Sequence, residues 1–105
     1  MLHESIHARL PEIGVVCQKY AVQKLYAFGS VVDGRFVEGK SDIDLLVEFY
    51  PISAVEKNQS LVNLWFDLEA LLSCEVDLVT PDSAKGPFFI KYLELYKVLI
   101  FEDHK

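Results

Sequence analysis

The stretch that decides the fold runs from Leu25 to Phe49 and reads LYAFGSVVDGRFVEGKSDIDLLVEF. A short apolar run ends at Gly29-Ser30, a polar loop follows, and an Asp-x-Asp pair opens a second apolar run. Strand side chains alternate between the two faces of a sheet, so a strand over residues 42–49 puts Asp42 and Asp44 on the same face. Two neighbouring carboxylates repel each other unless a cation lies between them. The stretch therefore predicts two strands, the second of which carries a pair of metal-binding carboxylates.

The glycine and serine at the end of the first strand predict a phosphate site. Gly29 has no side chain, so a phosphate can come close to the backbone amides there. Ser30 adds a hydroxyl donor beside it. Mg²⁺ prefers oxygen ligands and keeps part of its coordination shell for water and substrate phosphates. A phosphate cradle beside a carboxylate pair predicts a site for a metal-bound nucleoside triphosphate.

This pattern resembles a known family. A Gly-Ser after a strand, roughly ten residues, and then Asp-x-Asp at the start of an apolar strand is similar to the polymerase-beta-like nucleotidyltransferases. The segments FGS and SDIDLLVEF are most similar to the minimal nucleotidyltransferases (MNT), which are commonly encoded beside a HEPN-domain partner as the antitoxin of a toxin–antitoxin pair. The resemblance implies the nucleotidyltransferase fold, with a small mixed β-sheet and helices packed mainly on one face.

The rest of the chain alternates between helical and strand patterns, which is typical of an α/β or α+β domain. Pro11 interrupts the first helical pattern, either as a kink or as the start of the main helix. A second helix shows a candidate break near residues 57–60, with Ser60 as a candidate cap. The pattern leaves the order of strands in the sheet open. The predicted elements are a helix over 3–20, a strand over 22–28, a turn of helix and loop over 31–40, a strand over 42–49, a helix over 53–72, a strand over 75–80, a helix over 88–96 with Phe89, Leu93 and Tyr96 on one stripe, and a strand over 98–101.

Length and composition predict one cytoplasmic domain over residues 1–105. The chain is 51% hydrophobic, enough to bury a core, and its net charge of −6 argues against direct binding to a nucleic-acid polymer. No apolar run reaches about 18 residues, so no membrane span is expected. The N-terminus lacks the form of a signal peptide. Cys17 and Cys74 lack the CxxC spacing of a zinc site and are expected to be reduced.

The resemblance also assigns roles to individual residues. It implies that Asp42 and Asp44 hold the metal on ATP, that Gly29 and Ser30 hold its β- and γ-phosphates, and that two Mg²⁺ ions bind. The segment EVDLVT matches the family's third carboxylate at Asp77, which joins the second metal and positions or deprotonates the attacking hydroxyl. Glu75 remains an alternative for this role, because strand alternation puts it on the same face as Asp77.

One segment departs from the family pattern. Minimal nucleotidyltransferases often carry basic residues directly after the Gly-Ser, whereas this chain has Val31-Val32-Asp33-Gly34. A negative charge at Asp33 weakens the binding of a nearby triphosphate unless another charge offsets it. Arg35 and Lys40 are the nearby cations that could take this role.

Three functions follow from these observations. The first is a Mg²⁺-dependent nucleotidyltransferase that moves AMP from ATP to a hydroxyl of a partner protein, which the resemblance implies is a tyrosine of a HEPN toxin. The second is a catalytically degenerate antitoxin that neutralises its partner by contact, through the aromatic residues Trp65, Phe66, Phe88 and Phe89. The third is the catalytic subunit of a small-molecule or RNA nucleotidyltransferase. The sequence leaves self-association open in each case.

Overall fold

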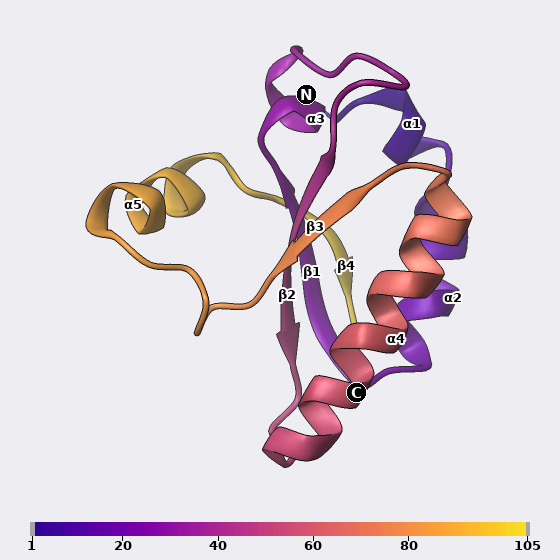
Figure 1. Cartoon of the computed structure of the whole chain (residues 1–105), viewed down its shortest axis with the longest axis vertical. Coiled ribbons are helices and arrows are strands. Elements are labelled where there is room, and N and C mark those ends of the chain that lie inside the picture. Colours follow the sequence, from indigo (N-terminus) through magenta and orange to yellow (C-terminus); the bar gives the residue numbers. More distant parts are fainter. Residues whose placement is uncertain (1, 105) are drawn as a thin grey trace.

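A four-stranded mixed sheet in the order β3-β2-β1-β4 lies at the centre of the structure, a computed structural model (Figure 1). The structure describes residues 2–104, so Met1 and Lys105, which the single-domain expectation included, lie outside it. The small mixed sheet implied by the family resemblance is confirmed. The elements along the chain are α1 (Glu4–His7), α2 (Leu10–Gln18), β1 (Val22–Phe28), α3 (Ser30–Asp33), β2 (Ile43–Phe49), α4 (Ala54–Leu72), β3 (Val76–Val79), α5 (Pro87–Tyr96) and β4 (Val98–Glu102).

Strand β2 lies between β1 and β3 and fixes the register of both. It pairs antiparallel with β1, where Phe28 lies opposite Asp44. It pairs parallel with β3, where Asp44 lies opposite Asp77. The second edge strand, β4, pairs antiparallel with β1. The register therefore places Phe28, Asp44 and Asp77 in one row across three neighbouring strands.

The two faces of the sheet are covered unequally. Ile43, Leu45 and Val47 are buried with residues of α2 and α4, as the alternation of β2 predicts. Leu46 points to the opposite face and packs with Phe28 and with Leu93 of α5. Figure 1 shows α2 and α4 together on one side of the sheet and α5 on the other. Asp44 is two residues from Leu46, so it projects toward the face that α5 covers.

The helix boundaries decide the alternatives that the sequence left open. The first helical pattern is two helices, and Pro11 stands in the first turn of α2, where its missing N–H costs no hydrogen bond. The helix predicted over 53–72 is confirmed, and the candidate break near residues 57–60 is absent, because α4 is continuous from Ala54 to Leu72. Ser60 is accordingly not a cap. The N-cap is Ser53, whose hydroxyl accepts a hydrogen bond from the Glu56 amide at 3.2 Å.

The aromatic residues of α4 and α5 have different surroundings. The indole of Trp65 donates to the Val76 carbonyl at 2.8 Å, which ties α4 to β3, whereas Phe66 is 65% exposed. The sequence pattern grouped Tyr96 with Phe89 and Leu93 on one stripe of α5, but the Tyr96 side chain is 57% exposed. Tyr92 packs against the sheet in its place, next to Phe89.

Neither cysteine is paired in the structure. Cys17 lies in the core, and burial raises the pKa of its thiol to about 12, so it packs as a small apolar side chain. The half-buried Cys74 donates to the Ser41 carbonyl at 3.3 Å. No helix within residues 2–104 is both long enough and apolar enough to cross a bilayer.

Leu64 tests how strongly the sheet depends on α4. This side chain is fully buried, so Leu64→Ala removes its contacts and leaves a cavity, with an expected loss of about 2–5 kcal/mol in the free energy of unfolding. Val62→Ala is the matched control on the same helix, because Val62 is 47% exposed and its loss should change stability by less than about 0.5 kcal/mol. Urea unfolding followed by circular dichroism measures both. Equal losses in the two variants would contradict the packing of α4 described above.

Candidate active site

The carboxylates that the sequence singles out gather at one end of the sheet. Asp44 and Asp77 occupy paired positions on β2 and β3, and adjacent strands lie about 4.8 Å apart. Asp42 directly precedes β2 and is exposed. The expected strand over residues 42–49 is thus one residue shorter at its start. Negative charge on Asp42 and Asp77 nevertheless acts on Asp44, so the three carboxylates lie within electrostatic reach of one another.

The negative charge of Asp44 is unfavourable in this arrangement. Its pKa is raised to about 6, first by burial of the half-buried carboxyl and then by the negative charges of Asp77 and Asp42. The positive charge of Arg35 opposes the increase in pKa. A cation bound by these oxygens would remove the repulsion that raises the pKa of Asp44. This carboxylate is therefore a strong candidate for a metal ligand.

The structure places Asp77 and Glu75 differently. Asp77 is paired with Asp44, and its negative charge raises the pKa of Asp44 more than that of Asp42 does. Glu75 precedes β3, and its carbonyl accepts a hydrogen bond from the Ile43 amide at 2.9 Å. The charge of Glu75 acts on Cys74, and it is not among the charges that shift the pKa of Asp44. Of the two candidates for the third carboxylate, Asp77 is the one that lies opposite Asp44 in the sheet and acts on its charge.

Gly29 lies directly against the carboxylate of Asp44. Its backbone adopts φ 74° and ψ −144°, a conformation that side chains disfavour. A Cβ at this position would collide with Oδ2 of Asp44. Ser30 follows as the first residue of α3 and is half-buried. The Gly-Ser pair and the carboxylates are therefore parts of one site, although they come from different strands.

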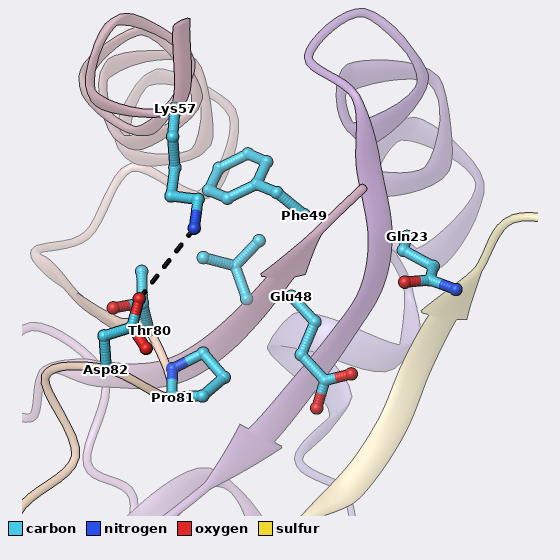
Figure 2. A pocket seen from close by; sticks show the side chains of 8 residues that line it. Gln23, Glu48, Phe49, Lys57, Thr80, Pro81 and Asp82 are labelled. Carbon is cyan, nitrogen blue, oxygen red and sulfur yellow. Dashed lines mark ion pairs between the residues drawn. The ribbon is translucent and has the colours of Figure 1, made fainter. Parts of the chain in front are cut away.

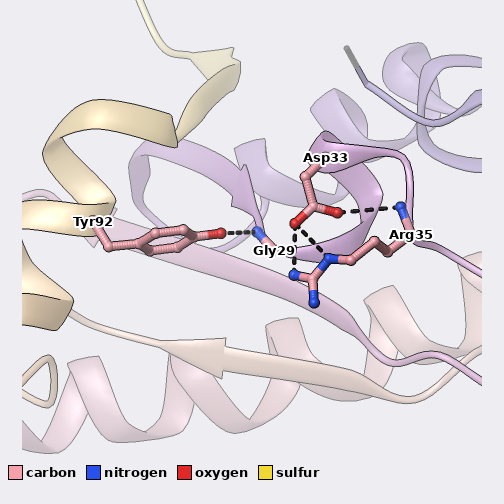
Figure 3. A network of polar contacts seen from close by, with 4 residues as sticks. All are labelled: Gly29, Asp33, Arg35 and Tyr92. Atoms are coloured by element: carbon pink, nitrogen blue, oxygen red, sulfur yellow. Dashed lines mark hydrogen bonds and ion pairs between the residues drawn. The ribbon is translucent and has the colours of Figure 1, made fainter.

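Tyr92 is a member of the site that sequence reasoning missed. Its hydroxyl accepts a hydrogen bond from the Gly29 amide at 3.0 Å, across 63 residues of sequence (Figure 3). In the sequence, Tyr92 is one aromatic residue among several in the pattern of α5. Nothing local to α5 indicates contact with Gly29, because that contact depends on where α5 lies on the sheet.

Asp33 is neutralised by a close ion pair. Arg35 donates to the Asp33 carboxylate from Nη2 at 2.6 Å and from Nε at 2.9 Å, as Figure 3 shows. Hydrogen bonds from Arg35 hold the pKa of Asp33 below its usual range. The positive charge of the guanidinium also acts on Asp44. Lys40 instead lines a cavity of about 390 Å³ together with Asp42. Of the two cations that the sequence offered, Arg35 is therefore the one whose charge acts on Asp44.

The donor set fits a divalent cation. Asp42, Asp44 and Asp77 offer carboxylate oxygens, which are the ligands that Mg²⁺ prefers. No three His, Cys, Asp or Glu side chains within residues 2–104 are already gathered in the arrangement of a metal cluster. The fit therefore rests on the oxygen chemistry and on the mutual repulsion at Asp44.

A second cavity lies at the other end of the sheet and is separate from these residues. It measures about 260 Å³ and lies where β2 and β3 end, whereas Asp44 and Asp77 lie near the starts of these strands (Figure 2). An ion pair of 3.8 Å between Lys57 and Asp82 borders it. Its lining is mixed and contains no cluster of carboxylates, so it has no part in the candidate active site.

Gly29→Ala tests the contact between the cradle and Asp44. The new methyl group strains the backbone and displaces the Asp44 carboxylate, with an expected loss of about 2–3 kcal/mol in the free energy of unfolding. Gly39→Ala is the matched control, because Gly39 also has a positive φ (80°) but would have open space around a Cβ. It should cost only about 1 kcal/mol. Thermal unfolding compares the two variants. The same loss in both would mean that Asp44 does not restrict position 29.

Asp44→Asn tests the electrostatic cost at the site. The folded-state pKa of about 6 lies above the usual value for aspartate, so the folded state holds the proton more tightly and stability falls as the pH rises through 4 to 6. Without metal at pH 7, Asp44→Asn should therefore raise the free energy of unfolding by about 1–2 kcal/mol, which is less than the full shift in pKa corresponds to because solvent screens a half-buried carboxylate. Urea titrations at pH 4 and pH 7 measure this gain. A gain of equal size at both pH values would contradict its electrostatic origin.

Comparison with known proteins identifies the family. Residues 13–100 match the family described as nucleotidyltransferase domain. A protein of Methanocaldococcus jannaschii, named as an inferred protein adenylyltransferase, is 37% identical over 78 residues, which span 73% of this chain and 74% of that protein. A solved structure described as an inferred minimal nucleotidyltransferase superimposes with a TM-score of 0.72 at 26% identity, covering 93% of this chain and 95% of that one.

The same fold recurs in a solved complex from Shewanella oneidensis that contains a tri-AMPylated HEPN toxin and an MNT antitoxin. The matched chain has a TM-score of 0.61 at 18% identity, with 92% of this chain and 72% of that chain covered. At this identity the likeness concerns the fold alone. The family match and the close relative together confirm the expected family, and the protein is a nucleotidyltransferase of the minimal nucleotidyltransferase family.

Proposed function

We propose that this protein transfers AMP from ATP to a hydroxyl group of a HEPN-type partner protein and thereby acts as the antitoxin of a toxin–antitoxin pair. The observation that carries the proposal is the row across the sheet, in which Asp44 lies beside Asp77 and against Gly29. The name of the Methanocaldococcus relative supports adenylyl transfer to a protein. The contents of the Shewanella complex support AMP as the transferred group and a HEPN toxin as the acceptor.

Each candidate residue has a separate role in the proposed reaction. Asp42 and Asp44 would hold one Mg²⁺ and Asp77 a second, and the ions would neutralise charge on the phosphates. The Gly29 amide and the Ser30 hydroxyl donate hydrogen bonds to the β- and γ-phosphates. Asp77 positions the acceptor hydroxyl and takes its proton. The hydroxyl oxygen bonds to the α-phosphorus as the bond to the bridging oxygen breaks, and pyrophosphate leaves.

The ion pair between Asp33 and Arg35 is compatible with both an active enzyme and an antitoxin that acts by contact. Arg35 offsets the charge of Asp33, which reduces the repulsion that Asp33 would otherwise exert on a triphosphate. This effect favours an active enzyme. However, the Arg35 guanidinium is already bound to Asp33 and is therefore less available to a triphosphate. This favours the second candidate, an antitoxin that acts by contact alone. A transfer assay separates the two candidates.

Label transfer from ATP tests the proposal directly. The purified protein is incubated with Mg²⁺, α-labelled ATP and the product of a neighbouring gene for a HEPN protein, and label on the partner is measured. The double variant Asp42→Asn, Asp44→Asn should lower the transfer rate at least about a hundredfold, because it removes the charges that hold the metal and stabilise the reacting phosphate.

Asp82→Asn serves as the control, because Asp82 is an exposed carboxylate at the opposite end of the sheet and its loss should leave transfer unchanged. Transfer at the wild-type rate by the double variant would rule out the assigned metal ligands. No transfer by the wild type, together with a stable complex of the two proteins, would rule out the enzyme and favour the contact antitoxin. Omitting Mg²⁺ or adding a chelator should abolish transfer in every variant.

A further inference from the structure

Tyr92 takes part in no role assigned so far, yet its hydroxyl is placed at the Gly29 amide. The N–H of Gly29 donates to this hydroxyl at 3.0 Å (Figure 3). Gly29 is buried, and a buried amide without a partner is costly. The amide is also the backbone donor of the proposed phosphate cradle. Tyr92 therefore partners this amide while no phosphate is present.

The ring of Tyr92 is held in place by its neighbours. It lies edge-on to Phe28, with ring centroids 6.4 Å apart, and it stacks with Phe89 at the same distance. Tyr96 approaches it to 5.3 Å. Because the ring is fixed by packing, little side-chain entropy is lost when its hydroxyl binds a ligand. Tyr92 lines a cavity of about 320 Å³ together with Gly29, Val32, Asp33 and Tyr96.

The donors and acceptors at this point favour a change in the hydrogen-bond partner of the Gly29 amide and of the Tyr92 hydroxyl when a triphosphate binds. In the free protein the phenol oxygen accepts from Gly29, and its own O–H stays able to donate. A phosphate oxygen only accepts, so the amide and the hydroxyl can both donate to it. Hydrogen bonds to an ionised acceptor are roughly twice as strong as bonds between neutral groups. Exchanging one neutral bond for two bonds to phosphate is therefore favourable.

We propose that the Tyr92 hydroxyl is a third donor of the phosphate cradle, which occupies the Gly29 amide in the free protein and turns to donate to a β- or γ-phosphate oxygen of bound nucleotide. This inference rests on the proposed function, since it requires the triphosphate to bind at Gly29. It makes α5 part of the nucleotide site.

Tyr92→Phe isolates the hydroxyl, because the phenyl ring keeps the packing against Phe28 and Phe89. Isothermal titration of the full chain measures the dissociation constants of Mg-ATP, Mg-tripolyphosphate and AMP. We expect Tyr92→Phe to weaken binding of the first two about fivefold, the loss of a charged hydrogen bond being partly offset by the neutral bond that no longer has to break. AMP lacks the β- and γ-phosphates, so its affinity should stay unchanged. Tyr26→Phe is the control, since Tyr26 belongs to the same apolar cluster and its hydroxyl makes no bond to Gly29.

The outcomes separate this inference from the proposed function. Unchanged affinity for Mg-ATP in Tyr92→Phe, with wild-type binding intact, overturns only the role of Tyr92. Tighter binding overturns it as well, because the hydroxyl would then compete with the phosphate. Failure of the wild type to bind either triphosphate overturns the inference and the proposed function together. Equal weakening of AMP would reveal a merely structural effect and also overturn the inference.

A second readout follows the Gly29 amide itself. In the free protein, Tyr92→Phe should shift the ¹H–¹⁵N resonance of Gly29 and speed its hydrogen exchange, whereas Tyr26→Phe should leave both unchanged. Adding Mg-tripolyphosphate to the wild type should shift the same resonance. A Gly29 resonance that responds to neither the substitution nor the ligand would overturn the inference.

Discussion

The site depends on one close approach, in which the carboxylate of Asp44 lies against Gly29 at a point where no Cβ fits. Asp44 belongs to β2, whereas Gly29 follows β1, and the antiparallel pairing of these strands brings the two residues together. The parallel pairing of β2 with β3 then adds Asp77 on the other side. Because β2 lies between both neighbours, a shift of its register would separate the carboxylate from the cradle and from its partner at once.

The electrostatics of the site follow from this placement. The chain has a net charge of −6, and at the candidate active site two of its carboxylates, Asp42 and Asp77, act on the half-buried carboxylate of Asp44. The folded protein tolerates this repulsion because packing of the opposite sheet face holds β2 in place. Such a site is stabilised by what binds there, since a cation or a metal-bound phosphate relieves the repulsion. The Asp33–Arg35 pair acts in the same direction, because it reduces the negative charge at the entrance.

Local sequence patterns predicted those parts of the fold that local physics determines. Alternation along the second strand placed Asp44 on one face, opposite its apolar neighbours, and Ile43, Leu45 and Val47 are indeed buried together on the other face. The bounds of β1 at Val22 and Phe28 were also predicted. Whether α4 is interrupted stayed open from sequence, because polar residues on the exposed side of a helix resemble a loop when only composition is considered; the helix is continuous.

Long-range features were beyond the reach of the same reasoning. The order of strands and the pairing of Asp44 with Asp77 depend on which segments meet in space, and no local pattern encodes this. The hydrogen bond between Gly29 and Tyr92 joins residues 63 positions apart for the same reason. The family resemblance supplied Asp77 as a candidate, and the structure then explains physically why it is better placed than Glu75.

The two faces of the sheet are packed against clusters of different size. The face under α2 and α4 holds the larger core, which fixes the strands and hence the spacing of the carboxylates. The face under α5 is held by a small cluster around Phe28, Leu46 and Leu93, and it carries Asp44 and Tyr92. A lightly packed element opens and adjusts at lower free energy than a core element. Asp44 belongs to a strand that the larger core holds from behind, whereas Tyr92 belongs to α5, which rests on the smaller cluster. The proposed hydrogen-bond exchange at Gly29 can therefore involve α5 without disturbing the row of Asp44 and Asp77.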